Sequence, residues 1–132
     1  MKQDNSKNQS FSFRKRIASF RHAFNGIRLA ISNEHNMRIH LFAALLAIGA
    51  GFYFQLTFGE WIVLVFAIGF VFAAELFNSA IESIADFISP GHHIAIGKIK
   101  DLAAGAVLVS AIAAIIAGIL IFWPHIKLLM KI

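Results

Sequence analysis

Residues 61–86 read WIVLVFAIGFVFAAELFNSAIESIAD, an apolar run followed by a segment that carries acids. The apolar run is typical of a helix that enters a bilayer. At about 100° per residue, the polar residues of the second part share one narrow helix face. This polar stripe consists of Glu75, Asn78, Glu82 and Asp86. Ionisable groups at membrane depth cost about 2.5–3.5 kcal/mol each, so the polar stripe predicts a site for a cation or for chemistry.

The composition predicts an all-α integral membrane protein. The chain has 132 residues, of which 58% are hydrophobic and 14% charged, and a soluble core of this size could not bury so much apolar surface. Three apolar segments predict transmembrane helices at about 41–58, 61–88 and 102–123. We expect Gly59-Glu60 to connect the first two spans. A proline-containing turn at residues 89–91 should end the second, residues 92–100 should form a polar linker, and Pro124 should end the third.

The N-terminal third predicts a tail and an interfacial helix. Residues 1–10 are polar and predict a disordered tail, and residues 11–132 predict a single membrane-embedded domain. No cleaved signal peptide is expected. Residues 11–33 place apolar side chains at three- and four-residue steps with basic ones between them, the pattern of an amphipathic interfacial helix. Its charges favour anionic lipid headgroups as a partner over nucleic acid.

Charge and small residues predict orientation and association. Three spans place residues 1–40 and the 89–101 loop on one side, which carries ten of the twelve Lys and Arg residues. By the positive-inside rule this side is cytoplasmic. The third predicted span is rich in Ala and Gly, which lets helices approach closely and favours an oligomer.

The acids themselves suggest chemistry with a cation. Glu82 and Asp86 are one helical turn apart, and like charges at this spacing recruit a cation. Glu34 precedes the first predicted span and could complete a magnesium site with Glu82. Glu75 lies deepest, so it is a candidate base for a hydroxyl held at the membrane surface. The adjacent pair His92-His93 is poorly spaced to share a metal.

Three other interpretations stay open on spacing alone. The acids could pair with Lys98, Lys100 and Arg28 and simply hold the helices together. The chain could also be a small cation or proton conduit, or a structural membrane subunit. The conduit is less favoured, because the first and third predicted spans contain few polar residues and the polar stripe ends about halfway through the bilayer.

Residues 75–86, ELFNSAIESIAD, resemble the signature of the prokaryotic diacylglycerol kinase family, Glu-x-x-Asn-Ser/Thr-Ala-Ile-Glu-x-x-x-Asp. The similarity continues through Gly97–Asp101, and Asn33-Glu34 and Arg38 occupy the expected place before the first span. It covers about residues 12–123. The resemblance implies a homotrimer of three-span protomers that moves the γ-phosphoryl group of Mg-ATP onto the primary hydroxyl of a membrane lipid at the cytoplasmic face.

The resemblance also implies a role for each matched residue. Glu75 is expected to be the catalytic base, and Glu34 and Glu82 the ligands of Mg²⁺. The residues expected to contact the ATP co-substrate are Lys15, Glu34, Glu82, Gly91, His92, His93, Lys100 and Asp101. Those expected to support the site or bind lipid are Arg28, Glu75, Asn78 and Asp86. Residues 19–26 and 34–40 look closer to undecaprenol kinases than to the enterobacterial diacylglycerol kinase, which favours undecaprenol over diacylglycerol as the acceptor.

Overall fold

The computed structural model describes residues 13–91 and 93–130, except for the side chains of Arg14 and Lys15. The described residues form four helices, which are α1 (Phe13–Asn33), α2 (His35–Tyr53), α3 (Phe58–Ile88) and α4 (Ile94–Met130). The predicted all-α fold is confirmed, and α2, α3 and α4 are each long and apolar enough to cross a membrane. The predicted tail, residues 1–10, lies outside the described residues.

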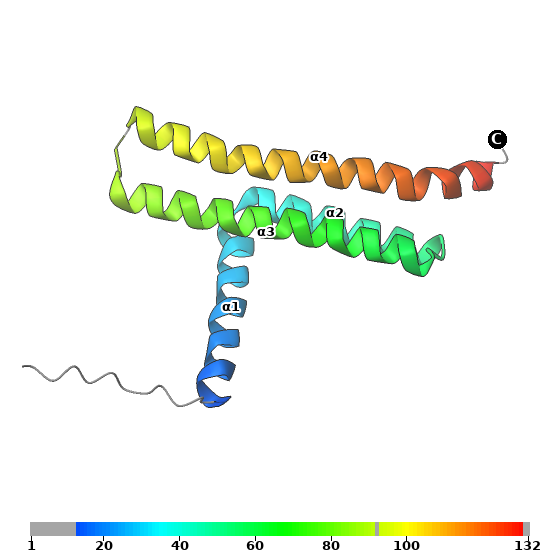
Figure 1. The fold of residues 1–132 in the computed structure, drawn as a ribbon, viewed down its shortest axis with the longest axis horizontal. Helices are drawn as coiled ribbons and strands as arrows, with labels where there is room; N and C mark the ends of the chain where they lie inside the picture. The colour runs from blue at the N-terminus through cyan, green and yellow to red at the C-terminus, as the bar shows by residue number, and fades with distance from the viewer. Residues whose placement is uncertain (1–12, 92, 131–132) are drawn as a thin grey trace, which may run out of the picture.

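The three spans run up and down beside one another, and α1 lies crosswise to them (Figure 1). α3 packs against both α2 and α4, and α1 contacts α2 and α3. The end of α3 and the start of α4 share one end of the bundle and extend past the start of α2 (Figure 1). Along the spans large apolar side chains stay exposed, for example Phe66 at 74% and Leu120 at 71%. Such surface suits contact with lipid or with further subunits.

The connection between α2 and α3 differs from the predicted one. It lies at residues 54–57, before Gly59-Glu60. Gln55 adopts a left-handed conformation with φ 54°. The N–H of Leu56 donates to the carbonyl of Gly51, and the N–H of Gln55 donates to that of Phe52. These two bonds form a Schellman motif, which satisfies the last carbonyls of α2 and turns the chain back at once.

Glu60 lies inside the first turn of α3 because it closes a capping box with Thr57. The Thr57 hydroxyl accepts from the N–H of Glu60 at 3.4 Å, and the Glu60 carboxylate accepts from the N–H of Thr57 at 2.7 Å. Two donors at the start of the helix are thereby satisfied. The prediction that Gly59-Glu60 forms the connection is wrong, since this box starts the helix at Phe58, three residues before the predicted position 61.

α1 ends at Asn33 and α3 at Ile88, as predicted, but other predicted helix ends differ from the observed ones. α2 begins at His35, capped by the backbone of Glu34, so the first span starts six residues before the predicted position 41. α4 begins at Ile94, within the predicted linker, and it runs through Pro124 to Met130. Proline removes only one helical N–H donor, and continuing the helix keeps the other backbone groups paired in apolar surroundings.

A small core holds the end of the bundle that contains the α2–α3 connection. Leu56, Leu64 and Ile121 pack together there. The Glu60 carboxylate also faces His125 of α4, with 2.9 Å between Oε1 and Nε2. Gly51 is required nearby, because a Cβ at this position would lie 2.8 Å from the Trp61 ring. The polar stripe lies toward the opposite end.

Thr57→Ala is expected to lower the free energy of unfolding by about 1 kcal/mol, because it removes the hydroxyl of the capping box. Thermal unfolding in detergent, followed by circular dichroism, measures the change. Thr57→Ser keeps the hydroxyl and is the matched control. Equal melting temperatures for the alanine and serine variants would contradict the proposed contribution of the cap.

Candidate active site

The polar stripe of α3 passes from the packed interior to the surface. Glu75 is buried, with only 2% of its side chain exposed, and Asn78 is buried as well. Glu82 is half-buried, whereas 66% of the Asp86 side chain is exposed. The stripe spans about 16 Å along the helix axis. The stripe therefore runs from a buried carboxylate at one end to a solvent-exposed one at the other.

Glu75 has a close neighbour on α2. The Nε2 atom of His40 lies 3.1 Å from Glu75 Oε1, which is an ion-pair distance when the imidazole is protonated. The ring N–H is not aligned for a hydrogen bond, so Oε1 has no hydrogen-bond partner among the described residues. Glu34 and Glu82 also lie near enough to interact with Glu75 electrostatically. The fold thus brings together the three predicted acids Glu34, Glu75 and Glu82.

Asn78 and Glu82 form one unit on successive turns of α3. Asn78 Nδ2 donates to Glu82 Oε1 at 3.1 Å. The amide oxygen of Asn78 is buried without a hydrogen-bond partner in the described part of the chain. An unpartnered buried acceptor costs about 1–3 kcal/mol, so this oxygen is suited to a ligand that donates to it.

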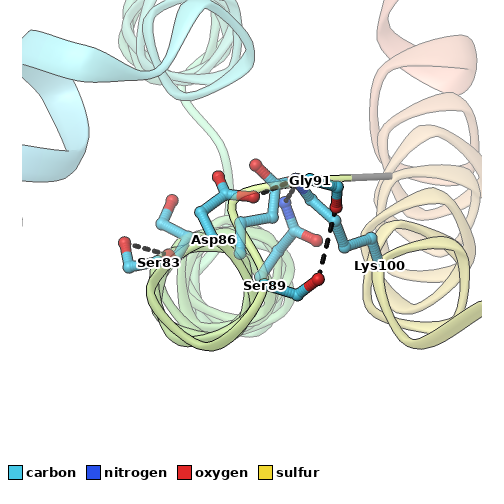
Figure 2. A network of polar contacts seen from close by, with 8 residues as sticks. Ser83, Asp86, Ser89, Gly91 and Lys100 are labelled. Atoms are coloured by element: carbon cyan, nitrogen blue, oxygen red, sulfur yellow. Dashed lines mark hydrogen bonds and ion pairs between the residues drawn. The ribbon is translucent and has the colours of Figure 1, made fainter. Parts of the chain in front are cut away.

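The turn between α3 and α4 holds the outer end of the stripe, as Figure 2 shows. Lys100 Nζ of α4 donates to Asp86 Oδ1 at 2.8 Å. The Ser89 hydroxyl donates to the carbonyl of Gly91 at 3.3 Å. His93 Nδ1 accepts from the N–H of Ala95 and so occupies the start of α4. The sequence left open whether the acids of the stripe pair with lysine. Asp86 does so with Lys100, whereas Glu75 lies beside His40 and Glu82 accepts a hydrogen bond from Asn78.

The remaining predicted site residues are placed as follows. Gly91, His93 and Asp101 are exposed around the start of α4, on the side of the Asp86–Lys100 pair. Arg28 is exposed on α1, and it lines a shallow depression with Arg21 and Asn25. The side chain of Lys15 and the whole of His92 lie outside the described residues.

Two cavities lie next to the polar stripe, one beyond its buried end and one beside it. The first, named the apolar groove, has a volume of about 340 Å³ and lies among α2, α3 and α4. Its lining is apolar apart from His40 at one end, and it consists of Ile39, His40, Ala43, Ala44, Ala47, Leu64, Ala67, Ile68, Val71, Phe72, Ala111, Ala114, Ile115, Gly118 and Phe122. Because His40 also touches Glu75, the groove leads away from the buried carboxylate.

The second cavity, named the α1–α3 groove, has a volume of about 250 Å³. It is lined by Gly26, Leu29, Ala30, Asn33, Glu34, Leu76, Ser79, Ala80 and Ser83. The Ser79 hydroxyl is buried there without a hydrogen-bond partner among the described residues. The Ser83 hydroxyl donates back to the carbonyl of Ser79 at 2.8 Å. Glu34 thus lines the α1–α3 groove and also lies near enough to Glu75 to interact with it electrostatically.

Carboxylate oxygens suited to a hard cation are present near Glu75. Glu34 and Glu82 are both half-buried carboxylates beside Glu75. In the described residues, no three histidine or carboxylate side chains are close enough to bind a metal by themselves. Mg²⁺ usually takes one or two carboxylates and completes its shell with water and phosphate oxygens. Glu34 and Glu82, the latter hydrogen-bonded to an amide whose oxygen is unpartnered, are oxygen donors of the kind that Mg²⁺ takes together with a phosphate ligand.

The sequence reasoning missed His40 and the two serines of the α1–α3 groove. The sequence predicted no role for His40, because it lies one residue before the first predicted span. A polar residue at the start of an apolar helix, six positions after Glu34, is the signal that could have pointed to it. Ser79 and Ser83 lie between stripe positions on α3, so their role depends on where α1 packs.

Comparison with known proteins decides the family. The family model of prokaryotic diacylglycerol kinase matches residues 21–122. The chain belongs to the prokaryotic diacylglycerol kinase family. It is 42% identical over 106 residues to the undecaprenol kinase of Bacillus subtilis (strain 168), covering 80% of this chain and 86% of that protein. It is 30% identical over 118 residues to the diacylglycerol kinase of Escherichia coli (strain K12), covering 89% of this chain and 97% of that protein.

Membership of the diacylglycerol kinase family establishes the class of reaction. The chain is a lipid kinase, a phosphotransferase with an alcohol acceptor that uses ATP as co-substrate. The resemblance predicted from residues 75–86 is confirmed. The conduit and the structural subunit are therefore set aside as descriptions of what this protein does.

Proposed function

We propose that this lipid kinase transfers the γ-phosphoryl group of Mg-ATP to the primary hydroxyl of a membrane lipid alcohol, with Glu75 as the base. The buried Glu75 carboxylate carries the proposal, because it lies where the polar stripe meets the apolar groove. A lipid alcohol has the same two parts, a polar hydroxyl and an apolar chain. With its hydroxyl at Glu75, its chain can follow the apolar groove toward Phe122.

The chemical step needs a base that accepts the proton of the lipid hydroxyl and a hydroxyl oxygen that receives the phosphoryl group. Glu75 takes the proton of the lipid hydroxyl as that oxygen forms a bond to the γ-phosphorus. The bond between the γ-phosphorus and the β–γ bridging oxygen breaks, and ADP leaves with the electron pair of that bond. General base catalysis of this kind contributes about 10²- to 10⁴-fold to the rate. Burial keeps competing water from the carboxylate.

Glu34 and Glu82 are the proposed ligands of Mg²⁺, with Asn78 holding Glu82 through its 3.1 Å hydrogen bond. A bound Mg²⁺ would supply charge neutralisation on the β- and γ-phosphate oxygens. The two carboxylates come from different elements, the start of α2 and the last third of α3. The packing of α2 on α3 therefore sets the distance between them.

The nucleotide is proposed to lie over the α3–α4 turn, where the outer end of the stripe is exposed. Lys100 supplies positive charge and Asp86 holds its side chain in place at 2.8 Å. Gly91 and His93, just before α4, and Asp101, in its second turn, are exposed and are further proposed contacts of the nucleotide. His92 and Lys15, with Arg28 on α1, complete the proposed nucleotide or lipid contacts. Such preorganised charges stabilise the negative charge of the phosphoryl group in the transition state.

The membrane placement follows from α1. Its apolar side chains are exposed and its basic residues alternate with them, so we place it in the interface against anionic headgroups. Because α1 lies crosswise to the spans, the last turns of α3 and the first turns of α4 then reach past the interface into water (Figure 1). The excess of basic residues supports a cytoplasmic position for this face. The prokaryotic family supports a bacterial plasma membrane as its location.

A homotrimer is the proposed assembly. The exposed apolar side chains of the spans exceed what three helices cover among themselves. Small residues of α4, such as Ala104 and Ala113, are also exposed and allow close approach of a second copy. Neighbouring protomers in such an assembly could complete each site.

Undecaprenol is the proposed acceptor. Its support is the higher identity to the undecaprenol kinase of Bacillus subtilis, at 42%, than to the diacylglycerol kinase of Escherichia coli, at 30%. Purified protein in mixed micelles with labelled ATP and Mg²⁺ is supplied with each lipid in turn. We expect kcat/KM for undecaprenol to exceed that for diacylglycerol at least about tenfold, which corresponds to about 1.4 kcal/mol.

The outcome of this comparison separates two parts of the proposal. Higher kcat/KM for diacylglycerol would overturn the choice of acceptor and leave the phosphotransfer intact. Transfer to neither lipid, in micelles where the Escherichia coli enzyme is active on diacylglycerol, would contradict the proposed reaction. Release of labelled phosphate into water, without transfer to lipid, would do the same.

A further inference from the structure

One contact of the site has no role in the mechanism above. His40 Nε2 and Glu75 Oε1 lie 3.1 Å apart, although His40 comes from α2 and Glu75 from α3. The exposed fractions of the two side chains are 24% and 2%. The contact therefore joins two helices at the point where the polar stripe meets the apolar groove.

The packing of α2 holds His40 toward α3. Met37, His40 and Ala44 lie at three- and four-residue steps, on one face of the helix. Met37 is 0% exposed and Ala44 is 8% exposed, so this face is the packed one. A histidine on the packed face of a spanning helix is costly unless its nitrogen has a partner. Glu75 Oε1 is the atom within reach.

The carboxylate in turn needs a partner that fixes its direction. Glu75 is repelled by Glu34 and Glu82, and its Oε1 atom is buried without a hydrogen bond in the described residues. In unliganded enzymes the hydrogen bonds of catalytic groups are often poorly aligned and tighten when substrate binds. The 3.1 Å distance allows a hydrogen bond after a small rotation of the ring.

We propose that His40 is a positioning residue for Glu75. Its Nε2–H holds Oε1, which leaves the second carboxylate oxygen to accept the proton of the lipid hydroxyl. His40 thereby acts on the rate of phosphoryl transfer and contributes little to the affinity for either substrate. This inference rests on the proposed role of Glu75 as the base.

Two polar variants of His40 test the contact. The amide nitrogen of glutamine matches the position of histidine Nε2, whereas that of asparagine matches Nδ1 and cannot reach Oε1. We expect His40→Asn to lower kcat about 30- to 100-fold, with both KM values changed less than about threefold, because a misplaced catalytic group costs about this much. His40→Gln is expected to keep kcat within about threefold of the original protein.

Controls separate this inference from the function on which it rests. His125→Gln changes a histidine that also lies close to a carboxylate, 2.9 Å from Glu60 at the opposite end of the bundle, and it should leave kcat unaltered. Melting temperatures in detergent show whether the asparagine and glutamine variants are equally folded. Glu75→Gln is assayed beside them. If Glu75→Gln retains turnover, the role of Glu75 fails. If that variant is inactive while His40→Asn turns over normally, only the positioning role of His40 fails.

Two further outcomes would also overturn the proposal. Equal loss of kcat in the asparagine and glutamine variants would show that Nε2 does not act as a donor to Glu75. A rise in the KM for lipid with kcat unchanged would make His40 a wall of the apolar groove instead. Recovery of kcat by glutamine alone is the result expected from the 3.1 Å contact.

Discussion

Glu75→Gln is expected to lower kcat by about 10²- to 10⁴-fold, the contribution of a general base. Glutamine has nearly the same shape as glutamate but cannot accept the proton of the lipid hydroxyl. Because Glu75 lies at the inner end of the polar stripe, away from the exposed Asp86–Lys100 pair, binding of ATP should change little. Turnover is measured with labelled ATP in mixed micelles, and nucleotide affinity by calorimetry on the same preparation.

The structure supplies a matched control for this substitution. Glu60→Gln makes the same change on the same helix, at the end of the bundle that is remote from the polar stripe. Glutamine also serves in a capping box, so this variant should fold and keep its kcat. Near-normal turnover of Glu75→Gln, with Glu60→Gln also active, would show that another group removes the proton.

Glu82→Gln should produce a different signature. We expect the Mg²⁺ concentration for half-maximal rate to rise at least about tenfold, together with the KM for ATP, since a carboxylate ligand of the ion is lost. Glutamine keeps an oxygen that can accept from Asn78 Nδ2, now at 3.1 Å from Glu82 Oε1. The substitution thus removes the charge and preserves the local hydrogen bond.

Titration of the rate with Mg²⁺ at fixed ATP measures this effect. High Mg²⁺ should restore much of kcat in Glu82→Gln, whereas it should not restore Glu75→Gln. Glu34→Gln should behave like Glu82→Gln, and the double variant should lose less than the sum of the two changes, because both act on one ion. An unchanged Mg²⁺ dependence in both single variants would remove these residues from the metal site.

Local pattern predicted much of the site and of the fold. The stripe Glu75, Asn78, Glu82 and Asp86 could be assigned to one face because the helical period places them there whatever packs around it. The three spans followed from apolar length alone. Helix ends were less predictable. The start of α4 within residues 92–100 and its passage through Pro124 depend on keeping backbone groups paired, which residue preferences do not encode.

Contacts between elements could not be predicted in this way. His40 and Glu75 meet across two helices, and Glu60 and His125 meet across another pair at the far end of the bundle. Each residue gives a weak local signal, because a single polar side chain shows no period. Only the packing of α2 and α4 on α3 decides which of these side chains lie within reach of one another.

The sequence by itself determined that three helices are long and apolar enough to cross a membrane and that acids lie on one face of the second, since both depend on the order of apolar and polar residues along a single helix. The tertiary structure alone decided the solvent exposure of each acid and the side chain that each acid contacts. Glu75 is buried beside His40, whereas Asp86 is exposed and paired with Lys100. Burial and the distance between side chains of different helices depend on which helix surfaces pack together.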